Sequence, residues 1–287
     1  MVDRAHLTLK VLISRFHKED ESLFLNALPD EEKESIQKLD IGGSTLEGLS
    51  LEGEKVVSSI HYSWALPVIK KLSKQEKEWV LSSLPPSYSK ALEALIQEDQ
   101  LHLKKLTPMG RKFFTNLLLK ELQPKEILPI AYLKPTSMLI LLKLDKNSLL
   151  ELIDFLGLYD LAEKIRSVVD KKKLSSIYRA LSSKEQKFLS YSLRSGDKTF
   201  LSDLDLSKWD GNGPKLKSLL HKKGLLRLAK AISEESPDFL WHLFHRLDTG
   251  RAAFLEKNLL PKSNEMVQAK LKDQILHILN IITPRGT

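Results

Sequence analysis

The side chains that could ligate a metal or transfer a proton are few and scattered in this chain of 287 residues, which contains eight histidines and no cysteine. His242 and His245 are three residues apart, so they would share one face of a helix and could offer two metal ligands. A metal site needs further ligands, and no His-Glu-x-x-His pattern supplies them. We therefore interpret the pair as ordinary histidines of a helix surface and expect no metal.

The motifs of the common enzyme classes are missing as well. There is no Gly-x-x-x-x-Gly-Lys-Ser/Thr phosphate loop, no glycine-rich dinucleotide fingerprint and no Gly-x-Ser-x-Gly turn. The carboxylates lie mostly among lysines at helical spacing, where solvation and pairing explain them. The lack of cysteine excludes thiolate nucleophiles and disulfides, and it fits a reducing compartment. We expect neither catalytic residues nor a cofactor, and so a protein that is not an enzyme.

The charge of the chain is moderately positive. Lys plus Arg number 45 and Asp plus Glu 37, which gives a formal net charge of +8. Such an excess could serve nucleic acid, an anionic membrane face or an acidic protein. Aromatic residues are few and do not alternate with arginine, so we expect no nucleic-acid binding. No signal peptide or membrane-spanning stretch is evident, so we expect a cytoplasmic protein that reaches the inner membrane face only through a partner.

The elements that must position these side chains are helices. Leucine and lysine dominate, and alternation with period two is almost absent. One spacing recurs: an apolar residue is followed by apolar residues seven, eight and twelve positions later, in copies that begin at Phe16, Leu72, Leu181 and Leu247. A weaker copy begins at Leu144. Repeated helical units form arrays that usually bind other proteins. The sequence predicts an all-α fold of armadillo-like helical hairpins that ends in a C-terminal helical bundle.

Capping residues explain how each copy turns. Ser73 and Ser182 precede a glutamate by three residues, which is the capping-box pattern. Asp145 and Asp248 occupy the equivalent position in two other copies and can also cap a helix. Thr107, followed by proline, marks a further helix start. Each unit should therefore be a helix, a short turn at the capping residue and a second helix.

Proline and glycine clusters suggest four segments. The strongest interruption is 210–214, where an aspartate, two glycines and an asparagine precede a proline. A softer boundary lies near Lys134 and Pro135. We expect an N-terminal helical hairpin over 1–40, a helical repeat domain over 52–133 and an armadillo-like middle domain over 135–208. The last segment is a C-terminal helical domain over 214–287.

The order of short motifs in the C-terminal half resembles a known family. Leu228–Ile232 reads Leu-Ala-Lys-Ala-Ile, Phe239–Phe244 follows, and the turn after Leu247 reads Asp-Thr-Gly-Arg-Ala-Ala. This order is similar to the C-terminal domain of the flagellar motor switch protein FliG, in which a Leu-Ala-x-Ala-Leu segment precedes an armadillo-like hairpin with the turn Met-Ser-x-Arg-Ala-Ala. The resemblance is good over 215–282, moderate over 135–195, and limited to the repeat before that.

The resemblance implies a changed function. The family's turn arginine corresponds to Arg251, but its acidic pair corresponds to Asn258 and Leu259, and its lysine falls near Ser233. The Glu-His-Pro-Gln docking motif and a Met-Phe-x-Phe motif are absent. In that family these charged residues belong to the surface that transmits torque. A chain that keeps the architecture but lacks most of these charges suggests a scaffold of a type III secretion or flagellar basal complex, such as a sorting-platform adaptor of the SctK type. It would dock cytoplasmic ring proteins to the membrane ring.

Two other function classes stay open at this point: a generic armadillo- or HEAT-like binding module with an unrelated client, and an enzyme with a helical active site. The expected partners are proteins of a ring complex, and an oligomer or ring of this chain is left open. A basic docking face is the candidate binding site, with a merely solvated helix surface as the alternative. Its residues would be Lys222, Lys223, Arg227, Lys230, Arg246 and Arg251.

Overall fold

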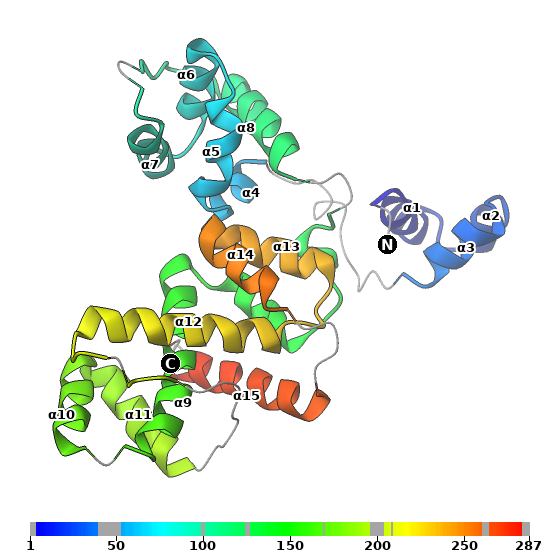
Figure 1. Ribbon diagram of the computed structural model, residues 1–287. Coiled ribbons are helices and arrows are strands. Elements are labelled where there is room, and N and C mark those ends of the chain that lie inside the picture. Colours follow the sequence, from blue (N-terminus) through cyan, green and yellow to red (C-terminus); the bar gives the residue numbers. More distant parts are fainter. Residues whose placement is uncertain are drawn as a thin grey trace, which may run out of the picture. The chain divides into compact units, whose positions relative to one another are not determined.

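The computed structural model describes residues 4–39, 53–98, 101–123, 127–168, 170–195, 204–207, 209–259 and 264–282. Every regular element within these ranges is a helix, which confirms the all-α, repeat-like fold (Figure 1). Contacts divide the chain into two units. The first unit comprises Met1–Pro135 with Ser236–Thr249, and the second comprises Thr136–Glu235 with Gly250–Thr287.

The first unit begins with three short helices, which we call the N-terminal segment (residues 4–39). They are α1 (Arg4–Phe16), α2 (Glu21–Asn26) and α3 (Asp30–Gln37). Ile13, Leu25 and Ile36 form one small buried cluster with Leu9 and Leu28 packed against it, and Leu7 and Val11 of α1 are buried as well. Such a core leaves much of the apolar surface of the segment outside it.

The larger part of the first unit is a group of five helices, with the single-turn helix η2 (Ile130–Tyr132) after them. The five are α4 (Gly53–Ser59), α5 (Tyr62–Lys70), α6 (Lys74–Ser83), α7 (Pro86–Ile96) and α8 (Pro108–Leu122). Ile69, Leu81 and Leu92 are fully buried at the centre of this group, and Leu118 joins them from α8. One face of each helix therefore supplies the core, as helical periodicity requires.

A helix from far along the chain completes the first unit. This is α13 (Pro237–Arg246), and its C-terminal end is fixed to α5. The indole N–H of Trp64 donates to the carbonyl oxygen of Leu247 at 2.9 Å. The His245 ring is stacked between Trp64 and Trp241, with ring centroids 4.0 and 4.1 Å away. Aromatic stacking and a hydrogen bond thus hold one end of α13.

The N-terminal end of α13 is held by Leu128. The Leu128 backbone N–H donates to the Asp238 carboxylate at 3.1 Å, and the His242 ring donates to the Leu128 carbonyl oxygen at 2.7 Å. His242 and His245 are only 8% and 9% exposed. The expectation that they are surface histidines is therefore wrong, because both rings pack inside the first unit.

The second unit is organised around the crossing of two long helices. Its elements are η3 (Ser137–Lys143), α9 (Lys146–Ile165), α10 (Lys171–Ala180), α11 (Ser183–Ser195), α12 (Gly213–Ala231), α14 (Thr249–Lys257) and α15 (Glu265–Ile282). Figure 1 shows α12 crossing α9. At the crossing an added Cβ on Gly157 would overlap the carbonyl group of Leu220, and one on Gly224 would overlap that of Ile153. Only glycine on both helices allows the backbones to approach so closely.

The repeated spacing corresponds to helix–turn–helix junctions in four copies. Leu72, Leu144, Leu181 and Leu247 each lie between two helices. Ser73 forms a complete capping box, Asp145 accepts two backbone N–H groups, and the Ser182 hydroxyl accepts from the Glu185 backbone. The expected caps are confirmed at these three positions, whereas the cap at Asp248 stays a prediction.

The copy that begins at Phe16 shares the spacing but not the packing. Phe16 is the last residue of α1 and is 61% exposed, and Leu23 of α2 is 69% exposed. The spacing therefore specifies a turn between helices, while burial of its apolar positions depends on neighbours that the pattern does not encode.

The division into units differs from the four expected segments. The boundary at Pro135 coincides with an expected one, but the expected domains 135–208 and 214–287 are not separate, because α12 packs across α9. The 210–214 interruption is instead a turn in which Gly211 has φ +87° and Asn212 caps α12. The expected break at 40–52 lies outside the described residues.

Replacing Gly224 with alanine should destabilise the second unit, because the new methyl group would collide with the α9 backbone. We expect Gly224→Ala to lower the free energy of unfolding by about 2 kcal/mol or more. Gly213→Ala is the matched control on the same helix, since its Cβ would meet only the Ala180 side chain at an ordinary 3.5 Å. Urea unfolding followed by circular dichroism measures both, and equal stability of the two variants would contradict the crossing.

The buried histidines of α13 should make the first unit sensitive to acid. Burial lowers the pKa of both His242 and His245 below the ordinary value of 6.5. The fold therefore favours neutral rings: their contribution is complete above about pH 6.5 and is lost as pH falls through the lowered pKa values. We expect stability to fall between about pH 7.5 and about pH 5.5, a range in which carboxylates stay ionised.

Chemical denaturation at both pH values, monitored by tryptophan fluorescence, measures this effect. The double variant His242→Gln with His245→Phe should be less stable than the wild-type chain at neutral pH but should lose less stability on acidification. His102→Gln serves as the control, because His102 is exposed. An unchanged pH dependence in the double variant would refute the assignment.

Candidate protein-interaction surface

The cations expected to form one basic docking face do not share one unit. Arg246 belongs to the first unit, while the second contains Lys222, Lys223, Arg227, Lys230 and Arg251. Lys222 is exposed, and Lys223, Lys230, Arg246 and Arg251 are half-buried. A single face built from all six is therefore not present within either unit.

Arg227 is not a surface residue at all. It is 1% exposed, and its guanidinium donates to both carboxylate oxygens of Asp160 at 2.8 and 2.9 Å. A third N–H donates to the Gln274 side-chain oxygen at 2.9 Å, and the group lies 5.6 Å from the centre of the Tyr159 ring. The expectation that Arg227 lines a docking face is wrong, because it joins α9, α12 and α15 inside the second unit.

Two other cations of α12 also form ion pairs within the second unit. Lys215 pairs with Asp210 at 2.6 Å, and Lys217 pairs with the Glu185 carboxylate of a capping box. Burial lowers the pKa of the Lys230 ammonium, and the negative charge of the nearby Asp160 carboxylate partly opposes this shift. Part of the positive charge of α12 is thus used in contacts within the second unit.

Arg251 takes part in a chain of hydrogen bonds across three helices. Its Nε–H donates to Nε2 of His221 at 2.8 Å, and Nδ1 of His221 lies 2.7 Å from the Asp154 carboxylate. Because a guanidinium can only donate, Nε2 of His221 accepts this bond, and Nδ1 faces the Asp154 carboxylate. The lone pair that a general base would need is therefore already occupied.

An exposed apolar row on α8 is the most distinctive surface feature that the structure adds. Met109, Phe113 and Leu117 are spaced four residues apart and are 82%, 56% and 45% exposed. Side chains at this spacing lie along one helix face. Phe113 also contacts the half-buried Phe114 ring, with centroids 5.3 Å apart, which fixes it against the helix. We call these three residues the α8 face.

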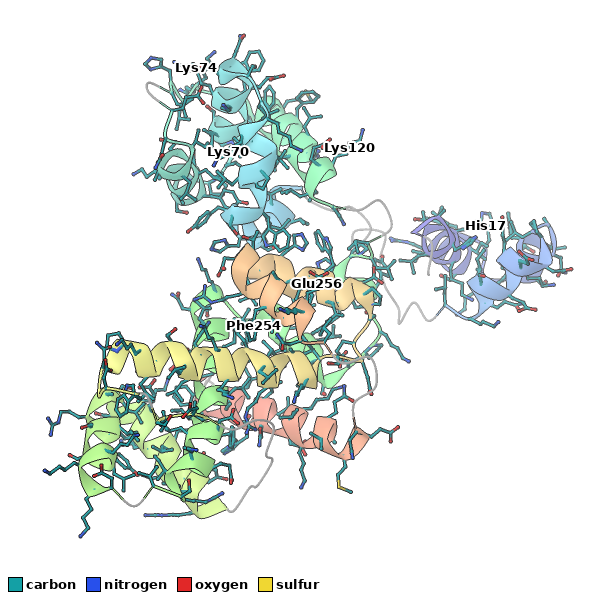
Figure 2. All side chains as sticks on the ribbon, in the orientation of Figure 1. His17, Lys70, Lys74, Lys120, Phe254 and Glu256 are labelled. Atoms are coloured by element: carbon teal, nitrogen blue, oxygen red, sulfur yellow. The ribbon has the colours of Figure 1, made fainter. Side chains whose placement is uncertain are left out.

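Positive charge flanks the α8 face. Lys112 and Lys120, again at helical spacing, form a parallel row with Asn116 between them, and Figure 2 shows Lys120 on the side of α8 away from α4–α7. Lys105 and Arg111 are exposed nearby in sequence. Within the described ranges none of these four cations has an ion-pair partner. The surface thus combines apolar contact area with unneutralised positive charge.

The sequence signal for the α8 face was present but ambiguous. Apolar side chains occur around the whole helix, since Leu118 and Leu119 point into the core while Phe113 and Leu117 do not. A helix that is apolar all round usually indicates complete burial. Only the packing of α4–α7 on one side of α8 shows which apolar residues remain outside.

Comparisons with known proteins do not indicate a function for this chain. No protein-family model matches the chain, and no curated protein or solved structure is detectably similar to it. In the described part of the chain, no helix has the length and apolar character to cross a bilayer. The same part contains no group of three or more histidine, aspartate or glutamate side chains placed to hold a metal ion.

Removing the Arg227 guanidinium should be costly, because the buried Asp160 carboxylate would lose its ion-pair partner and both of the hydrogen bonds that this partner donates. We expect Arg227→Met to lower the free energy of unfolding by about 3–5 kcal/mol. The double variant Arg227→Met with Asp160→Leu should recover much of that loss, since it removes both charges. Urea unfolding tests this, with Lys222→Met as the exposed control on α12. A neutral effect of Arg227→Met would show that the pair is not a structural link.

Proposed function

We propose that the protein is a non-catalytic helical scaffold that binds another protein molecule through the α8 face. The observation that carries the proposal is the exposed row of Met109, Phe113 and Leu117 beside unpaired cations. Amphipathic helices bind to such apolar rows, and charge at the rim selects the partner. The chemistry fits a helix with an apolar face and acidic flanks.

The assembly that we propose for this scaffold is a type III secretion or flagellar basal complex, in which it would dock cytoplasmic ring proteins to the membrane ring. This part rests on the motif resemblance around Arg251. The position of Arg251 supports a static role, because its guanidinium bonds His221 inside the unit. A repeat module with an unrelated client is the alternative.

Site-specific photo-cross-linking tests the proposal. A benzophenone amino acid placed at Phe113 in the producing bacterium should give a covalent adduct with a protein. Met266, an apolar residue of α15 that is 71% exposed, provides the matched control position. We expect an adduct at position 113 that the control lacks, and its mass spectrum identifies the partner. A secretion or flagellar ring protein supports the assembly, another protein supports the alternative, and no specific adduct contradicts binding at the α8 face.

A further inference from the structure

Half of the large apolar side chains that are exposed in the described ranges lie in two places. Of the 14 large apolar residues exposed in the described ranges, the α8 face accounts for three, and the N-terminal segment for four. Those four are Leu12, Phe16, Leu23 and Phe24, at 37%, 61%, 69% and 41% exposure. The ring centroids of Phe24 and His17 are 4.4 Å apart. His17 lies where the chain turns from α1 into α2 (Figure 2). The small core of the segment leaves this apolar surface uncovered.

The two apolar surfaces differ in the sign of the charge beside them. Residues 19–34 contain seven carboxylates and one lysine, whereas the end of α1 is basic, with the Arg15 guanidinium 5.6 Å from the centre of the Phe16 ring. Lys10 pairs with Glu21 and Lys38 pairs with Glu34. The remaining carboxylates have no ion-pair partner in the part of the chain that the structure describes. They are Glu19, Asp20, Asp30, Glu31 and Glu32. The stretch 19–34, which contains Leu23 and Phe24, therefore offers acidic charge and apolar area, which is the chemistry that the α8 face requires.

We infer that the occupant of the α8 face is the N-terminal segment of a second copy of this chain. The inference rests on the proposed function, because it names the partner of the same surface. Both surfaces are exposed. Burial of Phe113 against Leu23 and Phe24 would remove apolar area from water on both sides.

The symmetry of this contact determines what it builds. Two different surfaces meet, so each added copy leaves one α8 face and one N-terminal segment free. Heterologous contacts of this kind form rings when the rotation closes and open chains when it does not. Aromatic residues such as Phe113 usually dominate the affinity, while charges at the rim control the association rate and its salt dependence.

Sedimentation velocity of the full-length chain tests the inference. We expect species larger than a monomer to increase with protein concentration and to decrease with salt. Phe113→Asp and Leu23→Asp should each weaken self-association by about tenfold or more, because each places a charge in an apolar contact. Lys112→Glu with Lys120→Glu should weaken it as well. Met266→Asp is the matched control and should leave it unchanged, and circular dichroism verifies that every variant is folded.

A mixing experiment identifies which surfaces meet. Phe113→Asp retains an intact N-terminal segment, and Leu23→Asp retains an intact α8 face. Each variant alone should be monomeric, whereas an equimolar mixture should form a dimer that does not grow further. A wild-type chain that is monomeric at every concentration overturns the inference. A mixture that forms no dimer also overturns it, because the N-terminal segment would then bind the α8 face of its own chain or would bind no α8 face.

The outcomes also separate this inference from the proposed function. A monomeric chain with a foreign protein cross-linked at position 113 overturns only self-association. The absence of both the adduct and self-association overturns both. Flotation of the chain with anionic lipid vesicles, lost in Phe113→Asp, would show that the α8 face binds a membrane and would overturn both as well.

Discussion

The close contact between Gly157 and Gly224 determines most of the second unit. Because neither residue has a side chain, the backbones of α9 and α12 can touch, and the residues around the contact become fully buried. Arg227 lies one helical turn beyond Gly224, so its guanidinium meets Asp160 inside the unit rather than solvent. A buried ion pair of this kind needs complete hydrogen bonding. Gln274 accepts a third bond from the guanidinium and thereby joins α15 to the pair.

The first unit depends on a different type of interaction. Its helices form a local group, but α13 arrives from more than 100 residues further along the chain. Directional contacts hold it, among them the bonds between Trp64 and Leu247, between His61 and His245, and between Leu128 and both Asp238 and His242. The stacked His245 ring adds apolar contact only while it is neutral. The contacts that recruit a distant helix are therefore also the ones that protonation weakens.

Local features of the fold could be predicted from the sequence, and distant ones could not. Ser73, Ser182 and Asp145 act within one helical turn, so spacing alone predicts their caps. The position of α13 and the burial of Arg227 depend on residues far apart in sequence. The local sequence of a run such as Lys222–Lys230 does not show which of its residues face solvent and which face another helix. The predicted basic face therefore contained one core residue, while the α8 face was not predicted.

The distribution of charge connects these structural points to function. On α12 three of the six cations form ion pairs, with Asp210, Glu185 and Asp160. On α8 the described cations Arg111, Lys112 and Lys120 form none, although the inner side of that helix packs on the core of the first unit. Selection for stability alone would not keep Met109 and Phe113 exposed beside unpaired lysines, since exposed apolar residues contribute little to folding and promote association. The formal net charge of +8 is thus a poor guide to binding, because it counts the paired cations of α12 together with the free ones of α8. What distinguishes α8 is that apolar area and unneutralised charge coincide, which is the combination that a specific protein contact requires.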